Sequence, residues 1–289
     1  MPTQIQLLKK YRLLIRGHSG QHFLIDPNVQ RKLVDLLKLH PTDRVVEIGP
    51  GLGALTSKIL ESGAKVWAVE KDRRFVEILA EEFGRNFPDQ LTIIHQDILK
   101  LDLRKFMPQP PSPRIKFKVI SNLPYYVTTP VLFYLIENRC VISQAVLTLQ
   151  KEVAARLVAR PGAKDYSRLT LALRLYARID HAFDIHSKCF TPSPDVDSST
   201  VILTFYPESK LPAKADQEIL LNLFQIAFSQ RRKTLLHLLS RHRQISKSRI
   251  ELQKIFESVG IPENARGEEL LLKDYLALAQ ILFGRRKQF

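Results

Sequence analysis

The chain of 289 residues has few cysteines, no long apolar run and no signal-like N-terminus. With only Cys140 and Cys189, it supports neither a disulfide framework nor a zinc cluster, and we expect a reducing, intracellular site. The longest uncharged stretch, residues 120–136, contains an asparagine and two prolines and is too short and polar to cross a bilayer. The first 17 residues lack the apolar core and cleavage site of a signal peptide. These absences argue against secreted scaffolds and membrane proteins.

The chain also lacks the spacing that metal sites and serine nucleophiles require. His181 and His186 lie five residues apart, whereas two ligands on one helix face lie three or four apart, so we expect no metal. The segment 17–20, Gly-His-Ser-Gly, superficially resembles a nucleophile elbow. It follows a basic segment rather than a strand, which argues against a serine hydrolase.

Positive charge is what the chain has in excess. It contains 44 Lys and Arg against 29 Asp and Glu, a net charge of +15, which favours a polyanionic partner. Residues 229–254 alone hold eight cations and a single acid, Glu251. We interpret Arg231, Arg232 and Lys233 as phosphate contacts that position RNA without reading its sequence. The alternative is a solvated helix face.

Short β-rich runs alternate with helix-like segments between residues 40 and 150, which is typical of βαβ units in a doubly wound sheet. After them, the pattern predicts a helix over 167–177 and strands over 182–186 and 200–206. The segment 190–199 is too short for a crossover helix, so these two strands should be antiparallel. We therefore predict an α/β fold with a mixed seven-strand sheet. The first five runs begin at Arg44, Lys65, Leu91, Phe117 and Gln144.

Beyond Pro207 the sequence becomes helical, with apolar residues at three-and-four spacing over 216–240, 248–259 and 268–283. This change of pattern marks a second, all-α domain. The predicted domains are a basic N-terminal arm (1–17), an α/β domain (18–207) and a helical domain (208–289).

A glycine-rich turn, Glu47-Ile-Gly-Pro-Gly-Leu-Gly53, follows the first strand and opens a helix. Without a Cβ, Gly49 and Gly51 allow a tight turn and bring a ligand against the main chain. The order GxGxG after an acid, rather than GxGxxG, favours a nucleoside without phosphate over a dinucleotide. A plain tight turn is the alternative.

Acidic residues end the next two strands. Glu70 lies 21 residues past Gly49, where a carboxylate can accept hydrogen bonds from both ribose hydroxyls. Asp97 follows the third strand, where it can accept a hydrogen bond from an adenine amino group. Each alone could be a solvated acid. Together with the glycine turn they mark the crevice at the carboxyl ends of the strands, where open α/β sheets bind ligands.

The segment Asn122-Leu-Pro-Tyr125 ends the fourth strand. An adenine amine is a poor nucleophile because its lone pair is delocalised, and acceptance of its two hydrogens by the Asn122 oxygen and the Leu123 carbonyl would localise that pair. Pro124 would fix the backbone, and Tyr125 would offer a ring face for a flipped base. In-line attack on a sulfonium methyl would then need positioning and electrostatics, with no metal or covalent nucleophile. A proline turn with a buried tyrosine is the alternative.

The loop Phe190-Thr-Pro-Ser-Pro-Asp-Val-Asp-Ser198 is stiffened by two prolines. It can hold Phe190 against the other face of the same base, in a sandwich with Tyr125. A core phenylalanine is the alternative.

Taken together, these segments resemble the ribosomal RNA adenine dimethyltransferases, over nine tenths of the chain from about residue 17. The C-terminal segment 265–282 is similar to the branch that acts on small-subunit RNA. The resemblance depends on six motifs in register: GQHFL at 20–24, EIGPGLGALT at 47–56, QDIL at 96–99, NLPY at 122–125, FTPSPDVDS at 190–198 and FSQRRKTL at 228–235.

The resemblance implies a Rossmann-like methyltransferase that uses S-adenosylmethionine to dimethylate the N6 amines of two adjacent adenosines in the 3′-terminal hairpin loop of small-subunit ribosomal RNA. It further implies a cytoplasmic monomer that acts on immature small subunits during ribosome biogenesis and docks RNA on its helical domain. His22 departs from the asparagine usual in the family, although imidazole can still donate a hydrogen bond to the cofactor's carboxylate. The implied cofactor contacts are His22, Leu24, Gly49, Gly51, Glu70, Asp97 and Asn122, and the implied base contacts are Asn122, Leu123, Pro124, Tyr125 and Phe190.

Three other functions stay open from the sequence. The same chemistry could act on large-subunit RNA, although the C-terminal helices argue against it. The protein could be a non-catalytic ribosome-assembly factor that keeps the fold as a scaffold, a role compatible with activity. A nicotinamide oxidoreductase is a distant third, and a test of whether the protein binds NAD or S-adenosylmethionine would exclude one of them.

Overall fold

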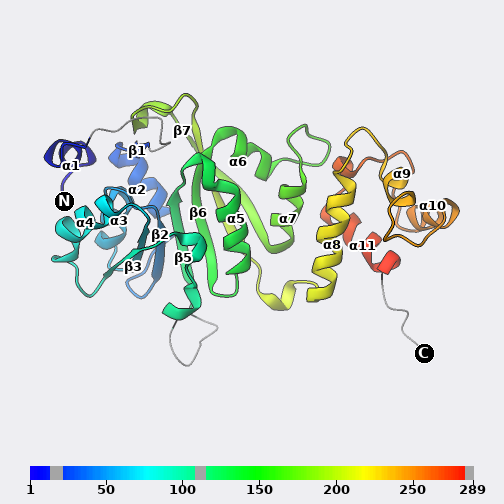
Figure 1. Ribbon diagram of the computed structural model, residues 1–289, viewed down its shortest axis with the longest axis horizontal. Coiled ribbons are helices and arrows are strands. Elements are labelled where there is room, and N and C mark those ends of the chain that lie inside the picture. The colour runs from blue at the N-terminus through cyan, green and yellow to red at the C-terminus, as the bar shows by residue number, and fades with distance from the viewer. Residues whose placement is uncertain (14–21, 108–114, 284–289) are drawn as a thin grey trace. The chain divides into compact units, whose positions relative to one another are not determined.

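The computed structural model describes residues 1–13, 22–107 and 115–283, and the chain forms two compact units (Figure 1). The first comprises Met1–Ala154 and Ala177–Tyr206, and the second comprises Ala155–Tyr176 and Pro207–Phe289. The expected boundary near residue 207 coincides with the third and last crossing between the units, but residues 155–176 belong with the helical unit rather than with the α/β domain. The chain thus leaves the α/β unit after Ala154, returns for its last two long strands, and leaves it again after Tyr206.

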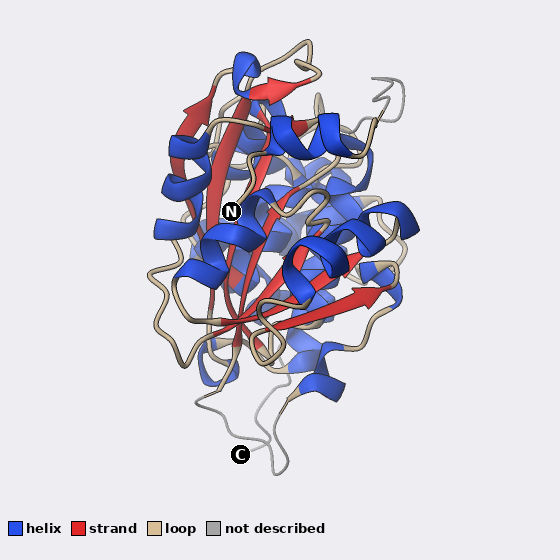
Figure 2. Ribbon diagram, turned by 90° about the vertical axis from the view of Figure 1, so that its left-hand side faces the viewer, coloured by secondary structure: helices blue, strands red, loops and turns tan. Residues whose placement is uncertain are grey.

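The first unit is built on a seven-stranded sheet of order β4-β3-β2-β5-β6-β9-β7. β9 is antiparallel to both β6 and β7, while the other neighbours are parallel, which confirms the predicted mixed sheet. Figure 2 shows the strands fanning out, as in a twisted sheet. The strands are β2 (Arg44–Ile48), β3 (Lys65–Glu70), β4 (Leu91–His95), β5 (Phe117–Asn122), β6 (Ile142–Gln150), β7 (Ala177–Ile185) and β9 (Ser198–Phe205).

The central strands are continuous apolar runs because helices cover the sheet. Val45 and Val66 on neighbouring strands are fully buried, in one cluster with Leu33 of α2 and Ile59 of α3. This packing fixes where β2 ends and α3 begins, and the glycine turn lies between them. The helices between the strands are α2 (Pro27–Asp35), α3 (Ala54–Glu61), α4 (Arg73–Leu79) and α5 (Thr128–Glu137).

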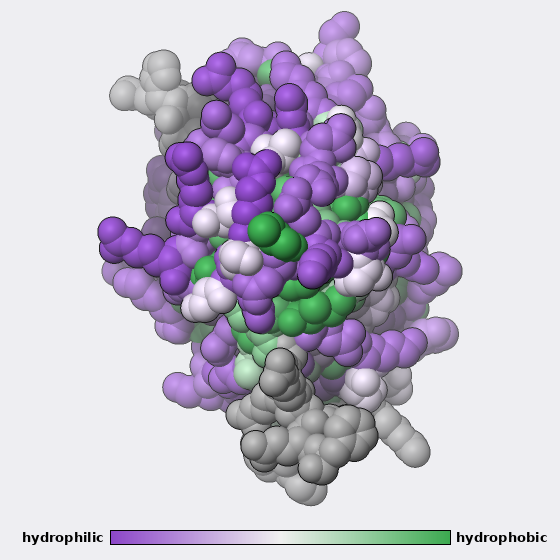
Figure 3. Space-filling view, turned by 90° about the vertical axis from the view of Figure 1, so that its right-hand side faces the viewer, coloured by the Kyte–Doolittle hydropathy of each residue, from purple (hydrophilic) through white to green (hydrophobic). Residues whose placement is uncertain are grey.

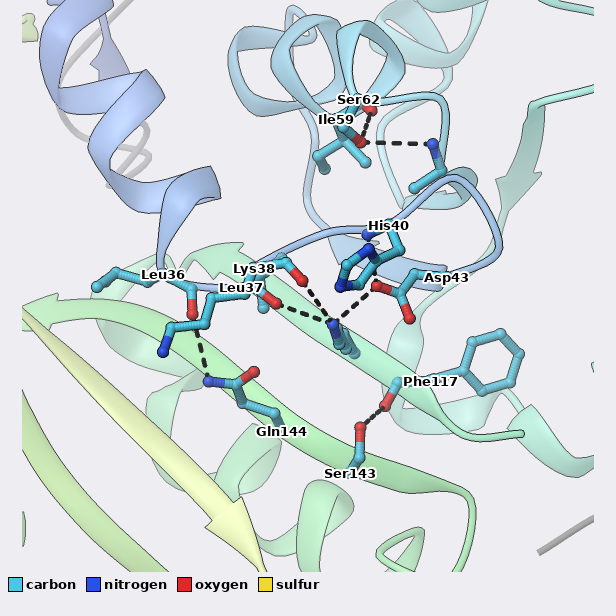
Figure 4. Close-up of polar contacts among 12 residues, drawn as sticks. Leu36, Leu37, Lys38, His40, Asp43, Ile59, Ser62, Phe117, Ser143 and Gln144 are labelled. Atoms are coloured by element: carbon cyan, nitrogen blue, oxygen red, sulfur yellow. Dashed lines mark hydrogen bonds and ion pairs between the residues drawn. The ribbon is translucent and has the colours of Figure 1, made fainter. Parts of the chain in front are cut away.

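Side chains from the sheet anchor the C-terminal end of α2 (Figure 4). The Lys118 Nζ donates to the carbonyls of Leu37 (2.9 Å) and Lys38 (3.1 Å) and pairs with the Asp43 carboxylate at 2.8 Å. Leu37 and Lys38 follow the C-cap of α2, outside any helix or strand, so their carbonyls need another donor, which the lysine provides. These contacts hold the start of β2, at the sheet edge opposite to the strands' carboxyl ends.

The N-terminus forms a packed helix, α1 (Gln4–Lys10), which begins with a capping box between Thr3 and Gln6. Leu7 is fully buried, in a cluster with Phe23, Leu52, Phe75 and Ile78 of the first unit. At the other end of α1, the Tyr11 hydroxyl donates to Glu82 at 2.6 Å, and Lys10 pairs with the same carboxylate. Residues 4–11 of the expected basic arm are therefore packed against the α/β unit, and residues 14–17 lie outside the described part.

The second unit consists of helices, and the predicted single helix over 216–240 is wrong. α8 ends at Ala227, and α9 begins only at Leu235, because the Thr234 hydroxyl caps it by accepting the His237 N–H. None of the described helices combines the length and apolar character that a membrane span needs. The helices are α6 (Lys151–Val158, which begins in the first unit), α7 (Arg168–Tyr176), α8 (Lys214–Ala227), α9 (Leu235–Ser240), α10 (Arg249–Ser258) and α11 (Leu272–Phe283).

Candidate active site

A cavity of about 570 Å³ lies at the carboxyl ends of β2, β3 and β5, within the size range of small-molecule sites. Segments from residue 4 to residue 190 contribute to its walls. The residues singled out from the sequence that line it are His22, Leu24, Gly49, Gly51, Glu70, Asp97, Asn122, Leu123, Pro124 and Phe190. The structure thus brings these residues to one place. The Tyr125 backbone lies in a 3-10 turn, Tyr125–Val127, but its side chain lies outside the described part.

The glycines of the turn between β2 and α3 all have positive φ. One of them allows close packing, and another leaves space in the cavity. A Cβ on Gly53 would come within 2.5 Å of the Phe83 ring, so this glycine permits close helix packing. A Cβ on Gly49 would meet no atom within 4 Å, and Gly49 lines the cavity. A side chain at Gly49 would therefore take space that a ligand could fill.

Glu70 is buried at the end of β3 and braces this turn. Its Oε2 accepts the Gly51 N–H at 3.1 Å, and its Oε1 accepts the N–H groups of Lys71 and Asp72, each at 2.8 Å. Burial raises the pKa of Glu70, and these backbone hydrogen bonds oppose the rise. A carboxylate has about four acceptor sites, so roughly one remains, on Oε2. This leaves Glu70 acceptor capacity for a ribose hydroxyl, and its predicted contact with the ribose stays a prediction.

Glu47 is a second buried acid in the wall of the cavity, at the end of β2. The Thr56 hydroxyl of α3 donates to its Oε2 at 2.5 Å. Burial is the main reason that the pKa of Glu47 is raised to about 8; the hydrogen bonds from Thr56 oppose the rise, and the nearby Glu70 charge adds to it. At pH 7 this carboxyl is mostly protonated, which the sequence motif, an acid before glycines, does not reveal.

Asp97 contrasts with the two glutamates because it lies in a more solvated place. Its Oδ1 accepts the Leu99 N–H at 3.0 Å, and its Oδ2 pairs with the Lys71 Nζ at 3.1 Å. Burial raises the pKa of Asp97, but these two hydrogen bonds outweigh it, so the net pKa is lowered. The carboxylate stays ionised and can accept an amino group, in competition with an exposed lysine.

The Asn122 side chain is oriented by a segment 100 residues away. Its Nδ2 donates to the His22 carbonyl at 3.1 Å, which leaves the oxygen as the amide's acceptor. The His22 Nδ1 lies 2.8 Å from the Pro192 carbonyl oxygen. Because a carbonyl can only accept, Nδ1 carries the ring proton and donates it. Three motifs distant in sequence are thus tied together at one wall of the cavity.

Phe190 belongs to the hydrophobic core and to the cavity wall at once. The short strands β1 (Phe23–Leu24) and β8 (Phe190–Thr191) pair antiparallel and place Leu24 opposite Phe190. Phe190 is 4% exposed and packs in the main core cluster. The expectation of a core phenylalanine and that of a base contact are therefore compatible, and the second stays a prediction.

Several residues that line the cavity were missed from the sequence, and two of them bear on its function. Tyr126 is 71% exposed although it lines the cavity, and the doubled tyrosine after Pro124 was the signal for it. Gln4 of α1 also lines the cavity, and no pattern in the N-terminal segment indicated it.

The residues present fit S-adenosylmethionine. The cofactor carries a sulfonium and an ammonium against one carboxylate, a net positive charge, and the cavity wall holds the acids Glu70, Asp72 and Asp97 against the rim cations Lys71 and Arg73. The open space beside Gly49 allows a ligand to approach the backbone. A neutral or cationic nucleoside suits this wall better than a phosphate would.

The cations expected to bind RNA differ in their surroundings. The Arg231 guanidinium pairs with Glu268 at 2.6 Å and donates to the Lys164 carbonyl at 2.9 Å, so it braces the helical unit. Arg232 and Lys233 are exposed in the loop between α8 and α9. Figure 3 shows that the surface facing the viewer is largely hydrophilic, with a small hydrophobic area near its centre.

Comparisons with known proteins show the family of the chain. The model of the family described as ribosomal RNA adenine dimethylase matches residues 13–282. The chain is 35% identical over 283 residues to ribosomal RNA small subunit methyltransferase A of Lachnoclostridium phytofermentans, covering 98% of this chain and 97% of the relative. It is 38% identical over 277 residues to the protein of that name from Streptococcus mutans, covering 96% and 94%.

The fold is shared with a solved structure of similar description. The crystal structure of a dimethyladenosine transferase from Plasmodium falciparum superposes with a TM-score of 0.75 at 27% identity, covering 89% of this chain and 96% of that one. The first unit is therefore a Rossmann-like methyltransferase domain. The chain belongs to the ribosomal RNA adenine dimethylase family and is an S-adenosylmethionine-dependent adenine methyltransferase.

Proposed function

We propose that the protein dimethylates the N6 amines of two adjacent adenosines in the 3′-terminal hairpin loop of small-subunit ribosomal RNA. The relatives are named as small-subunit methyltransferases over nearly their whole length, which supports this substrate. The observation that carries the chemistry is the orientation of Asn122, whose nitrogen is held by the His22 carbonyl. An acceptor oxygen in the wall of a cofactor-sized cavity is what an adenine amine requires.

In this proposal the end of β5 activates the target amine. The Asn122 oxygen and the Leu123 carbonyl accept its two N–H hydrogens, and Pro124 holds the backbone there. The Leu123 N–H is bound to the Thr148 carbonyl of β6 at 3.2 Å, so the sheet fixes the geometry. The bound cofactor supplies an electrophilic methyl group, and positioning accounts for most of the acceleration.

The flipped base would rest on Phe190, whose position is fixed by the pairing of β8 with β1. The Tyr125 ring would take the opposite face, a role that depends on the sequence alone. The rigid loop and the core packing of Phe190 mean that little side-chain entropy is lost when the base binds.

We further propose that the helical unit holds the RNA backbone. Arg232 and Lys233 are the best placed of the predicted phosphate contacts because they are exposed. Arg231 has its guanidinium bound within the protein, so we expect it to position this loop rather than to contact phosphate directly. The substrate would be the immature small subunit, in the cytoplasm, with the protein acting as a monomer.

The test is methyl transfer from labelled S-adenosylmethionine to under-methylated small subunits, to naked small-subunit RNA and to large-subunit RNA. We expect label on two adjacent adenosines of the small-subunit hairpin, located by mass spectrometry. Label on large-subunit RNA alone would overturn the proposed substrate. No label on any adenine in any assembly state would overturn the proposed reaction.

An Asn122→Ala variant separates catalysis from binding. We expect it to bind subunits as the wild type does and to lose methylation by about 100-fold or more, because the amine loses its acceptor. Glu257→Gln, an exposed change on α10, is the control and should keep full activity. Full methylation by Asn122→Ala would contradict the role given to the asparagine.

A further inference from the structure

The N-terminal helix places a polar side chain in the wall of the cofactor cavity. Gln4 is 4% exposed, and its Nε2 donates to the Leu52 carbonyl in the glycine-rich turn at 3.3 Å. Its Oε1 is buried and has no hydrogen-bond partner among the described residues. A buried acceptor without a donor costs free energy, so an unmatched one beside a ligand cavity calls for a donor from the ligand.

Gln4 is held at this place by contacts further along α1. Leu7, one helical turn further, is fully buried against Phe23 and Leu52, and Tyr11 is bound to Glu82 at 2.6 Å. The amide is therefore part of the wall of the cavity and not a chance contact of a loose terminus.

The chemistry around Gln4 identifies the part of the cofactor that it meets. The sequence predicts that Glu70 and Asp97, at the ends of β3 and β4, bind the ribose and the adenine of the cofactor. Gln4 instead bonds to the glycine-rich turn, and its helix packs on Phe23, the residue after His22. This is the end of the cavity left for the amino-acid part, which carries an ammonium with three N–H donors.

We propose that Gln4 is a cofactor-binding residue, whose Oε1 accepts a hydrogen bond from the ammonium of S-adenosylmethionine while its Nε2 holds the glycine-rich turn. The inference depends on the cofactor and not on the RNA substrate. α1 then does two things: it covers the methionine end of the cavity, and it completes the set of acceptors there.

The test compares two ligands by calorimetry on the full chain without RNA. S-adenosylhomocysteine carries the ammonium, whereas 5′-methylthioadenosine lacks the whole amino-acid part. We expect Gln4→Ala to weaken S-adenosylhomocysteine binding about 10- to 100-fold, as for a hydrogen bond to a charged group, and to weaken 5′-methylthioadenosine binding far less, because that ligand loses only the indirect effect of the bond to the turn. Equal losses for both ligands, or no loss for S-adenosylhomocysteine, would overturn the proposal.

Two further variants keep the result interpretable. Gln4→Met fills a similar volume without an acceptor, so it should show the same selective loss even if alanine loosens α1. Ile5→Ala changes the next residue, which is 47% exposed, and should alter neither affinity. Thermal unfolding without ligand reports whether α1 stays docked. Because no RNA is present, a wrong RNA substrate would not affect this outcome, and the two proposals fail separately.

Discussion

The floor and the mouth of the cavity use the same carboxylate chemistry in opposite surroundings. On the floor, Glu47 and Glu70 are buried, and burial raises the pKa of both. At the mouth, the hydrogen bond from Arg74 lowers the pKa of Asp72, and the Asp97 carboxylate is bound by an exposed lysine. The difference teaches that the fold fixes the position of the floor carboxyl groups before any ligand binds. At the mouth, solvent and exposed charged side chains determine the surroundings of the carboxylates.

The two regions should therefore respond differently to substitution. A floor residue is tied to backbone N–H groups, so its loss changes the glycine-rich turn as well as the ligand contacts. A mouth residue is tied to long, exposed side chains, whose ion pairs contribute little to stability. Each variant below tests whether this contrast holds.

The largest effect is expected for Glu70→Ala on the floor. The change removes the ribose contact and leaves the N–H groups of Gly51, Lys71 and Asp72 without their acceptor. We expect S-adenosylhomocysteine affinity to fall by about 100-fold or more, with lower thermal stability. Calorimetry and thermal unfolding measure the two effects. Glu77→Gln, at an acid 64% exposed, is the control and should change neither. An affinity within threefold of wild type would show that Glu70 only braces the turn.

The glycines of the turn should separate binding from stability. Gly53→Ala drives a Cβ into the Phe83 ring, and we expect a loss of about 1–3 kcal/mol in the free energy of unfolding from overpacking alone. Gly49→Ala has open space around it, so it should cost only the strain of positive φ, about 1–2 kcal/mol, while it blocks the ligand. Denaturant unfolding and cofactor titration distinguish them. Normal cofactor affinity in Gly49→Ala would place the ligand elsewhere.

The pH dependence of stability should reveal Glu47. Its folded pKa, about 8, lies above its ordinary value of 4.5, so the folded state binds a proton more tightly than the unfolded state. This contribution to stability is fully present below pH 4.5 and is lost as the pH rises to 8, at up to about 1.4 kcal/mol per pH unit. Glu47→Gln should flatten the fall of stability over this range, whereas Glu77→Gln should not. Parallel curves for wild type and Glu47→Gln would mean that the buried carboxyl is ionised.

Much of the first unit could be predicted because its strands are apolar runs in a regular alternation with helices. The sheet is confirmed, since the short link between residues 190 and 199 forces the last pair to be antiparallel. The lining of the cavity could be predicted for a similar reason: the carboxyl ends of parallel strands meet at one edge, so motifs at strand ends lie together.

What could not be predicted depends on contacts distant in sequence. Residues 155–176 join the helical unit through partners beyond residue 207, such as the Tyr166 hydroxyl on the Leu270 carbonyl at 3.0 Å. The apolar spacing over 216–240 continues across the loop between α8 and α9. The spacing alone therefore does not reveal that Thr234 caps a new helix there. Gln4 was missed because its partner in the glycine-rich turn is 48 residues away and bonds through a backbone atom.

The smallest effect is expected at the mouth, for Lys71→Met. The Lys71 side chain is 74% exposed, and its ion pair with Asp97 spans 3.1 Å in contact with solvent. We expect the free energy of unfolding to change by less than about 0.5 kcal/mol, and by still less at high salt, because the pair is screened. Cofactor affinity should rise slightly at low salt, since the Asp97 Oδ2 no longer has a competing donor. Titrations at two salt concentrations measure both effects. Two outcomes would contradict the contrast: a loss of more than about 1 kcal/mol in the free energy of unfolding, or a fall in affinity like that of Glu70→Ala. Either would show that the lysine is held in a fixed position, as the floor residues are.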